Sequence, residues 1–366
     1  MKILQVLPEL NSGGVERGTL EMAKYLVSKG HDSLVLSNGG GLVEKLEREG
    51  STHLRLPVHK KSPFSLRQIP AIKRLLREHR PDIIHLRSRL PGWLCHLAWK
   101  QMPARERPHY VTTVHGLHSV GTYSSIITRG ERIICVSHAV RDHLTRNYPK
   151  TDTRKLRIIH RGIDPEHYPA GYQPDDDWLG AWYEEFPETM GKKLLTLPGR
   201  ITRLKGHRDF FEILSRLPDD CHGLIVGGTH PKKRAYFQEI KELASRNNLT
   251  ARVTFTGQRS DLREILALSS LAFSLSRTPE SFGRTTLEAL SIGTPVIGYD
   301  HGGVGEILKT CFPVGATPKG QIEKAVSLAT RLLSSSPTID APGPFLLENM
   351  LSQTVELYRG LLHPHS

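Results

Sequence analysis

The chain has 366 residues, a length that favours two domains because a single core rarely grows so large. Its 38% apolar and 24% charged residues are ordinary for a globular protein, and no apolar run approaches the roughly 20 residues that a bilayer-spanning helix needs. Four widely spaced cysteines, Cys95, Cys135, Cys221 and Cys311, argue against a zinc site or a disulfide framework and suit a reducing cytoplasm.

In the first half of the chain, short apolar runs alternate with helical patterns. Residues 3–7 are expected to form a buried strand and not a signal peptide, because the run is short and ends at Pro8. A glycine-containing loop and a helical pattern from Leu20 to Val27 follow. Another helix is predicted at 43–49, and further strands at 33–36, 83–86, 110–114 and 133–136.

The segment 171–191 interrupts this alternation, because it is rich in acidic, aromatic, Pro and Gly residues, and we expect it to be partly packed through Trp178 and Trp182. We expect it to connect an N-terminal domain, 1–170, to a C-terminal domain, 192–344, while the helices at 345–366 return to the first domain. Strands of the second domain are predicted at 194–197, 224–226, 253–255, 271–275 and 295–299. Strands separated by helices imply parallel pairing with right-handed crossovers. The predicted class is therefore α/β, with two facing, Rossmann-like, doubly wound domains and a cleft between them.

The net charge of +13 is unevenly distributed. Residues 1–170 hold 28 Lys and Arg against 15 Asp and Glu, whereas residues 171–366 hold 22 of each kind. A basic half of this kind indicates an anionic surface or an anionic acceptor as partner. Alternatively, the N-terminal half is simply basic and soluble, without an anionic partner.

One segment of the basic half has the pattern of a membrane-surface helix. Residues 66–79 are predicted to be helical, with an apolar stripe at Leu66, Ile69, Ile72, Leu75 and Leu76 and with Arg67, Lys73, Arg74 and Arg77 off the stripe. Lys60 and Lys61 come just before it. Although such a stripe usually packs on the sheet, the basic side chains predict reversible docking on an anionic membrane.

Gly13 and Gly14 follow the first predicted strand and precede a helix. Glycines here let the backbone approach a ligand, and a helix N-terminus favours an anion. The pair also suits a plain turn, and it is not the GxGxxG dinucleotide fingerprint. A phosphate site and a turn both stay open.

Two cations follow the first strand of the second domain. Arg200 comes directly after Pro198-Gly199, and Lys205 comes five residues later. In open parallel sheets the ligand site lies beyond the carboxyl ends of the strands. An Arg that can bind bidentately and a Lys that acts as a point charge suit a diphosphate there.

Two glutamates, Glu280 and Glu288, are separated by seven residues. Glu280 is expected in the loop after the 271–275 strand, and Glu288 on a helix that starts near Gly283. The first N–H groups of that helix have no partner within the helix. A loop carboxylate, a helix N-terminus and a second carboxylate can together hold a sugar hydroxyl, a phosphate and a ribose.

The sequence resembles the retaining glycosyltransferases of family 4, which have the GT-B fold. The specific part is the Glu-x7-Glu block followed by Gly293-Thr294-Pro295-Val296, whereas glycine pairs are common. The resemblance runs nearly from end to end and includes Gly13-Gly14-Val15-Glu16, Pro81-Asp82-Ile83-Ile84-His85, Thr113-Val114-His115-Gly116, Val136-Ser137, Gly162-Ile163-Asp164, Gly199-Arg200 with Lys205-Gly206, Phe255-Thr256-Gly257, and Gly302-Gly303 with Glu306.

The resemblance implies a role for each matched residue. Gly14 lets the backbone reach the donor phosphate, and His115 touches the transferred sugar or its phosphate. Arg200 and Lys205 neutralise the diphosphate leaving group, while Glu280 holds sugar hydroxyls and Glu288 holds ribose hydroxyls. The implied catalytic residues are His115, Arg200, Lys205 and Glu280. The implied donor site contains Gly13, Gly14, Arg200, Lys205, Arg259, Glu280, Ser281, Phe282, Gly283, Arg284, Thr285 and Glu288.

The implied reaction needs no cofactor. A nucleoside diphosphate gains negative charge as it leaves, and fixed cations with helix N–H groups lower the barrier to that step. No protein nucleophile is evident, so the resemblance implies a front-face substitution in which the leaving phosphate assists deprotonation of the acceptor. No metal is expected, because the acidic run Asp175-Asp176-Asp177 falls in the expected connection and is typical of a solvated turn.

The expected partners are a nucleotide-sugar donor, with UDP as the favoured nucleotide, and an anionic glycan or glycolipid acceptor. Together with the basic half, they predict a cytoplasmic enzyme that is peripheral to the inner face of the cytoplasmic membrane and makes lipopolysaccharide core or another envelope glycan. Arg161, Ser281 and Arg284 depart from the common family pattern and leave the donor open.

The sequence leaves three rival functions. A GT-B sugar-nucleotide epimerase would bind the same donor without a sugar acceptor. A basic nucleic-acid-binding protein is disfavoured because no aromatic platform or known module is present, so no nucleic acid is expected. A nicotinamide dehydrogenase lacks its fingerprint.

Overall fold

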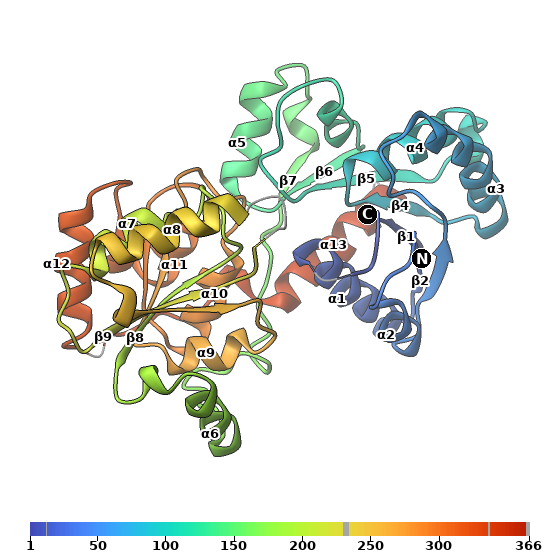
Figure 1. The fold of residues 1–366 in the computed structure, drawn as a ribbon. Coiled ribbons are helices and arrows are strands. Elements are labelled where there is room, and N and C mark those ends of the chain that lie inside the picture. The colour runs from blue at the N-terminus through green and yellow to red at the C-terminus, as the bar shows by residue number, and fades with distance from the viewer. Residues whose placement is uncertain (12, 230–233, 336, 364–366) are drawn as a thin grey trace. The chain divides into compact units, whose positions relative to one another are not determined.

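The computed structural model describes residues 1–11, 13–229, 234–335 and 337–363 and shows two compact α/β units (Figure 1). Unit 1 comprises Met1–His160 and Glu348–Ser366, and unit 2 comprises Arg161–Leu347. The doubly wound α/β class predicted from the sequence is confirmed, because each unit is built on one parallel sheet with helical crossovers.

Unit 1 contains a seven-stranded parallel sheet with the order β3-β2-β1-β4-β5-β6-β7. Almost all residues of the central strands are buried, which is the pattern of a sheet covered on both faces. The strands are β1 (Lys2–Val6), β2 (Asp32–Ser37), β3 (Thr52–Arg55), β4 (Ile83–Leu86), β5 (His109–Val114), β6 (Arg132–Cys135) and β7 (Leu156–Ile158).

The helices of unit 1 pack apolar faces on this sheet. Ile72 and Leu76 of α3 join Leu4 and Ile84 of the sheet in one core cluster. The helices are α1 (Gly14–Ser28), α2 (Val43–Arg48), α3 (Ile69–His79), α4 (Arg89–Lys100) and α5 (His138–Asn147), with a 3-10 turn, η1 (Pro63–Gln68), before α3.

The last helix, α13 (Leu347–Leu362), packs on unit 1 beside α1 (Figure 1). The Tyr25 hydroxyl of α1 donates a hydrogen bond to Glu348 at 3.0 Å. The buried Tyr358 hydroxyl shares a 2.5 Å hydrogen bond with Nδ1 of His85, whose Nε2 lies 2.5 Å from the Thr113 hydroxyl. Unit 1 is therefore built from two separate stretches of the chain.

Unit 2 repeats the same winding with six parallel strands in the order β10-β9-β8-β11-β12-β13. In Figure 1, α7 and α8 cover one face of this sheet, and α9 lies on the other. The strands are β8 (Lys193–Pro198), β9 (Cys221–Val226), β10 (Val253–Gly257), β11 (Leu271–Ser274), β12 (Val296–Tyr299) and β13 (Ala316–Thr317). The helices are α7 (His207–Leu214), α8 (Arg234–Arg246), α9 (Leu262–Leu268), α10 (Arg284–Ile292), α11 (Gly302–Cys311) and α12 (Ile322–Leu332).

The residues expected to connect the domains lie in unit 2 and contain a helix, α6 (Asp176–Glu185). The Asp175 side chain caps it by accepting a hydrogen bond from the Trp178 backbone N–H at 2.8 Å. Trp182 is 1% exposed and packs against Leu194 and Leu224 of the sheet. The acidic run therefore opens a helix that is anchored by its aromatic side chains.

Three strands were not predicted from the sequence: β3, β7 and β13. All three lie at a sheet edge, where one side is solvated and a continuous apolar run is not required. In the described part of the chain, no helix combines the length and apolar character that a bilayer crossing requires.

Candidate functional site

The site in unit 2 forms where two neighbouring strands end. β8 pairs in parallel with β11, with Leu195 opposite Leu271. The loop after β8 carries Arg200 and Lys205, and the loop after β11 carries Glu280. The carboxyl ends of parallel strands lie at one edge of the sheet. These side chains can therefore come together although they are far apart in the sequence.

Lys205 and Glu280 are brought into contact. The Lys205 ammonium donates to Oε1 of Glu280 at 2.7 Å, and the Ser276 hydroxyl donates to the same oxygen. Burial favours a raised pKa for the Glu280 carboxyl, but the charge of Lys205 and these hydrogen bonds outweigh it and hold the pKa below its ordinary value. The carboxylate is thus ionised at neutral pH. The sequence did not predict Ser276 as a site residue. The signal that could have indicated it is its position four residues before Glu280.

The loop that carries Glu280 is fixed by the two glycines that open α11. The Gly303 N–H donates to the Glu280 carbonyl at 2.8 Å. A Cβ on Gly302 would lie 2.5 Å from that carbonyl oxygen, and one on Gly303 would lie 2.3 Å from the Phe282 Cα. Only glycine permits this close packing, which explains the Gly302-Gly303 pair seen in the sequence.

The helix α10 begins beside this loop. Its N-cap, Gly283, has φ 104°, a left-handed conformation that glycine adopts without strain. Arg284 and Thr285 form the first turn, preceded by half-buried Ser281 and by buried Phe282, which packs edge-on against Phe345. The backbone N–H groups of such a turn favour an anion. The loop and helix boundaries expected for Glu280 and Glu288 match those observed.

Glu288 is buried on α10, 4% exposed. The Tyr168 hydroxyl donates to its Oε1 at 3.1 Å, and Nε of Arg284, one turn earlier, lies 3.4 Å from the same oxygen. A buried carboxylate with a cationic neighbour and a hydroxyl donor remains a strong acceptor. Tyr168 lies 120 residues before Glu288, and no sequence pattern linked the two.

Arg200 and Arg259 are in different situations. Arg200 is exposed on the loop after β8 and has no ion-pair partner among the residues that the structure describes. Arg259 is instead bound to α6: its guanidinium lies 2.8 Å from Glu185 and 2.7 Å from Asp261, over the Trp182 ring. The charge of Arg259 is thus paired with these two carboxylates, and no contact joins it to Lys205 or Glu280 among the described residues.

The remaining predicted residues lie in unit 1, at the carboxyl ends of its strands. Gly13 is the N-cap of α1, after β1, and Gly14 is the first residue of that helix. His115 directly follows β5 and is half-buried. The metal-free character of the site stays a prediction that chelation can test.

Comparison with known proteins follows the division into two halves. Residues 12–167 match the family described as Glycosyltransferase Family 4, and residues 181–341 match the family of glycosyl transferases group 1. A curated relative, N-acetyl-alpha-D-glucosaminyl L-malate synthase of Bacillus anthracis, is 25% identical over 317 residues, which span 82% of this chain and 79% of the relative.

Two solved structures extend the comparison. A glycosyltransferase from Rickettsia africae has a TM-score of 0.85 at 30% identity, covering 99% of this chain and 98% of its own. HepE from Anabaena, solved with UDP and glucose, has a TM-score of 0.79 at 18% identity, covering 98% of this chain and 100% of its own, which is a likeness of fold.

Proposed function

Because this chain belongs to the GT-B glycosyltransferases of family 4, we propose that it is a retaining, metal-independent hexosyltransferase that uses a UDP-sugar donor. The observation that carries the proposal is the convergence of Lys205, Glu280 and the N-terminus of α10 at one sheet edge. This arrangement supplies a cation, a carboxylate and backbone N–H groups, which are the groups that a nucleoside diphosphate and its sugar require.

The proposed mechanism assigns the leaving diphosphate to Arg200, Lys205 and the first turn of α10. Charge that develops on the diphosphate is stabilised by cations already fixed in place. Glu280 accepts hydrogen bonds from sugar hydroxyls, and Glu288 accepts them from the ribose. The acceptor hydroxyl then attacks the anomeric carbon of the sugar from the same face that the diphosphate leaves. It gives its proton to the departing phosphate oxygen. His115 is assigned to the transferred sugar or its phosphate.

UDP is the proposed nucleotide because HepE, which shares the fold, was solved with UDP and glucose. The acceptor that we propose is an anionic glycan or glycolipid of an envelope, such as lipopolysaccharide core, made on the cytoplasmic face of a membrane. The excess basic charge of the N-terminal half supports this class of acceptor.

The surface around η1 supports peripheral membrane contact. Phe64 is 67% exposed and Leu66 52% exposed, whereas Ile72 and Leu76 of α3 are buried in the core. Leu66 thus lies on the 3-10 turn before α3 and not on the packed stripe expected for it. Lys61 lies over the Tyr123 ring and Arg67 over the Phe64 ring. Exposed apolar side chains with basic side chains beside them favour binding at the interface of an anionic bilayer.

A calorimetric screen of nucleotide sugars, followed by a transfer assay with the one that binds, tests the proposed function. We expect one UDP-sugar to bind and its sugar to appear on an acceptor with the anomeric configuration kept. Inversion of the anomeric centre, or conversion of the donor to its epimer without transfer, would contradict the proposal, and the second result would establish the epimerase alternative.

A further inference from the structure

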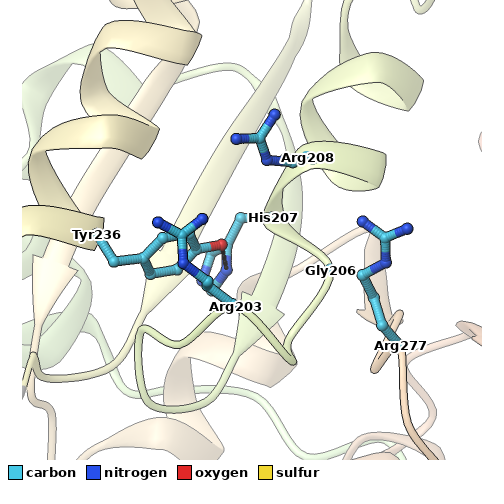
Figure 2. Close-up of a pocket in the computed structure, with 6 residues that line it drawn as sticks. All are labelled: Arg203, Gly206, His207, Arg208, Tyr236 and Arg277. Atoms are coloured by element: carbon cyan, nitrogen blue, oxygen red, sulfur yellow. Dashed lines mark hydrogen bonds between the residues drawn. The ribbon is translucent and has the colours of Figure 1, made fainter. Parts of the chain in front are cut away.

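A hollow of about 120 Å³ lies in unit 2 between the first turn of α7, the helix α8 and the loop after β11 (Figure 2). One water needs roughly 10–15 Å³ on such a measure, so a group of several heavy atoms fits. The proposed reaction uses none of the side chains that border it. Its lining residues are Arg203, Gly206, His207, Arg208, Tyr236 and Arg277.

The hollow is formed by the close approach of two loops. Gly206, the N-cap of α7, has φ 76°, and a Cβ there would lie 2.1 Å from the Leu275 carbonyl oxygen. The Arg277 N–H donates to the Leu204 carbonyl at 2.7 Å. These contacts hold the loop after β8 against the loop after β11, and thereby set Arg277 opposite the first turn of α7.

The charges around the hollow do not cancel. Arg203 donates to Oε1 of Glu239 at 3.0 Å, and Arg208 binds the same carboxylate. Arg277 is exposed and has no acidic partner among the described residues. Among the described side chains, three guanidinium groups therefore border the hollow against the one carboxylate of Glu239, an excess of two positive charges.

Polar groups also lie beneath the opening. The Arg203 guanidinium stacks over the Tyr236 ring at 4.8 Å, and Nδ1 of His207 lies 3.4 Å from the Tyr236 hydroxyl. His207 is 1% exposed, and its Nε2 makes no hydrogen bond within the described chain. Burial, together with the charge of Lys205, lowers the pKa of His207 to about 4, so its imidazole is neutral at neutral pH. Burial raises the pKa of Tyr236, which keeps its hydroxyl protonated.

We propose that this hollow is an oxyanion site for a phosphoryl group, distinct from the position proposed for the donor diphosphate. A phosphate dianion matches the excess of two charges, whereas a carboxylate matches one, and guanidinium groups bind phosphate through paired N–H donors. The site is distinct because the side chains make different contacts: Lys205 binds Glu280, whereas Arg203, on the same loop, and Arg208, in the first turn of α7, bind Glu239 on α8. The phosphoryl group is either carried by a phosphorylated sugar or is free phosphate.

The test is isothermal titration of the full chain with inorganic phosphate, glucose 6-phosphate and acetate, with and without saturating UDP. Arg277→Gln is the informative variant because Arg277 is exposed and forms no ion pair within the described residues. Arg331→Gln on α12 is the matched control, since it removes the same charge from an exposed position of the same unit. Thermal melting and UDP binding report whether each variant stays folded.

We expect wild type to bind phosphate in the presence of UDP, Arg277→Gln to weaken it at least tenfold, and Arg331→Gln to change it less than twofold. Tighter binding of glucose 6-phosphate than of phosphate would support a phosphorylated sugar as the ligand, and equal binding would support free phosphate. Absence of phosphate binding by wild type, displacement of phosphate by UDP, equal effects of the two variants, or acetate binding as tight as phosphate would overturn the proposal. UDP binding is measured separately. Loss of UDP binding would count against the proposed function and not against the phosphoryl site.

Discussion

The Lys205 ammonium lies 2.7 Å from Oε1 of Glu280, although 75 residues separate the two in sequence. Each of these two charges is therefore neutralised by the other. In the proposed mechanism, a diphosphate that binds Lys205 shares it with Glu280 and brings the sugar hydroxyls within reach of the same carboxylate. The proposed site thus couples phosphate binding to sugar binding through one ion pair.

Glu280→Gln should mainly lower turnover. The carboxylate contacts that we propose to the sugar strengthen as the sugar distorts, so their loss raises the barrier more than it weakens donor binding. We expect kcat to fall on the order of 10-fold or more, with a smaller change in KM for the donor. Steady-state kinetics with varied donor measures this, and Glu323→Gln, an exposed carboxylate on α12, is the control. Unchanged turnover would remove Glu280 from the catalytic set.

Glu288→Gln should mainly weaken donor binding, by about 1–3 kcal/mol for a lost charged hydrogen bond. Glu264→Gln is a matched control, because Glu264 also accepts from a tyrosine hydroxyl, Tyr172 at 3.1 Å, and pairs with an arginine, Arg263 at 2.7 Å. Calorimetry with UDP and with the donor gives the affinities. Equal losses in the two variants would show a structural role for Glu288 and no contact with the ribose.

Activity should survive excess chelator, because Arg200 and Lys205 are proposed to stabilise the charge of the leaving diphosphate in place of a metal ion. Lys205→Ala should reduce kcat on the order of 10² or more, the effect of removing a fixed electrostatic stabiliser. Lys193→Ala, which breaks a 2.9 Å ion pair with Asp220 in the same unit, should leave kcat unchanged. Loss of activity in EDTA that magnesium restores would contradict the metal-free mechanism.

Binding to vesicles should depend on anionic lipid and on the surface around η1. Each basic side chain near such a surface contributes roughly 1 kcal/mol, so reversing Lys60 and Lys61 should release most of the protein. Reversing the exposed Lys45 and Arg48 of α2 is the matched control. Co-sedimentation with neutral and with anionic vesicles measures the effect, which should weaken with salt. Equal binding to both lipids, or equal effects of the two reversals, would rule out this surface as the membrane contact.

Acid should destabilise unit 1 partly through His96. Burial, helped by the charge of Arg129, lowers its pKa to about 4 from 6.5, and its ring stacks on Trp99. Between pH 4 and pH 6.5 the unfolded chain therefore binds more protons than the folded chain. The free energy of unfolding falls as the pH drops from 6.5 towards 4. The loss is on the order of 1–3 kcal/mol. Denaturant unfolding of His96→Phe, followed by tryptophan fluorescence, should show a flatter pH dependence across this window; an unchanged slope would contradict the assignment.

Local pattern was sufficient for the central strands and for the position of Glu280 in a loop and Glu288 on a helix. Those features depend on apolar runs and on residues close in sequence. The edge strands β3, β7 and β13 carry no such run. For α6, the Pro, Gly and acidic content indicated a connection, and its aromatic residues indicated partial packing through Trp178 and Trp182, whereas the sheet residues that Trp182 contacts are far along the chain.

The partners of the site residues were the least predictable part. Tyr168 reaches Glu288 across 120 residues, and Arg259 is bound by Glu185, 74 residues earlier. Both contacts exist only because the winding of unit 2 brings distant loops together. The sequence pattern indicated which charges gather at the strand ends, but pairing among them depends on the three-dimensional arrangement.

The return of α13 to unit 1 has a consequence for the order of folding. Residues 161–347 of unit 2 leave the ribosome before Tyr358 is available to His85, so the first unit to begin synthesis is the last that can be completed. Until then, the surface that α13 covers stays open on the nascent chain. A premature stop before residue 348 would therefore damage the N-terminal half of the sequence, even though every residue of that half had been made.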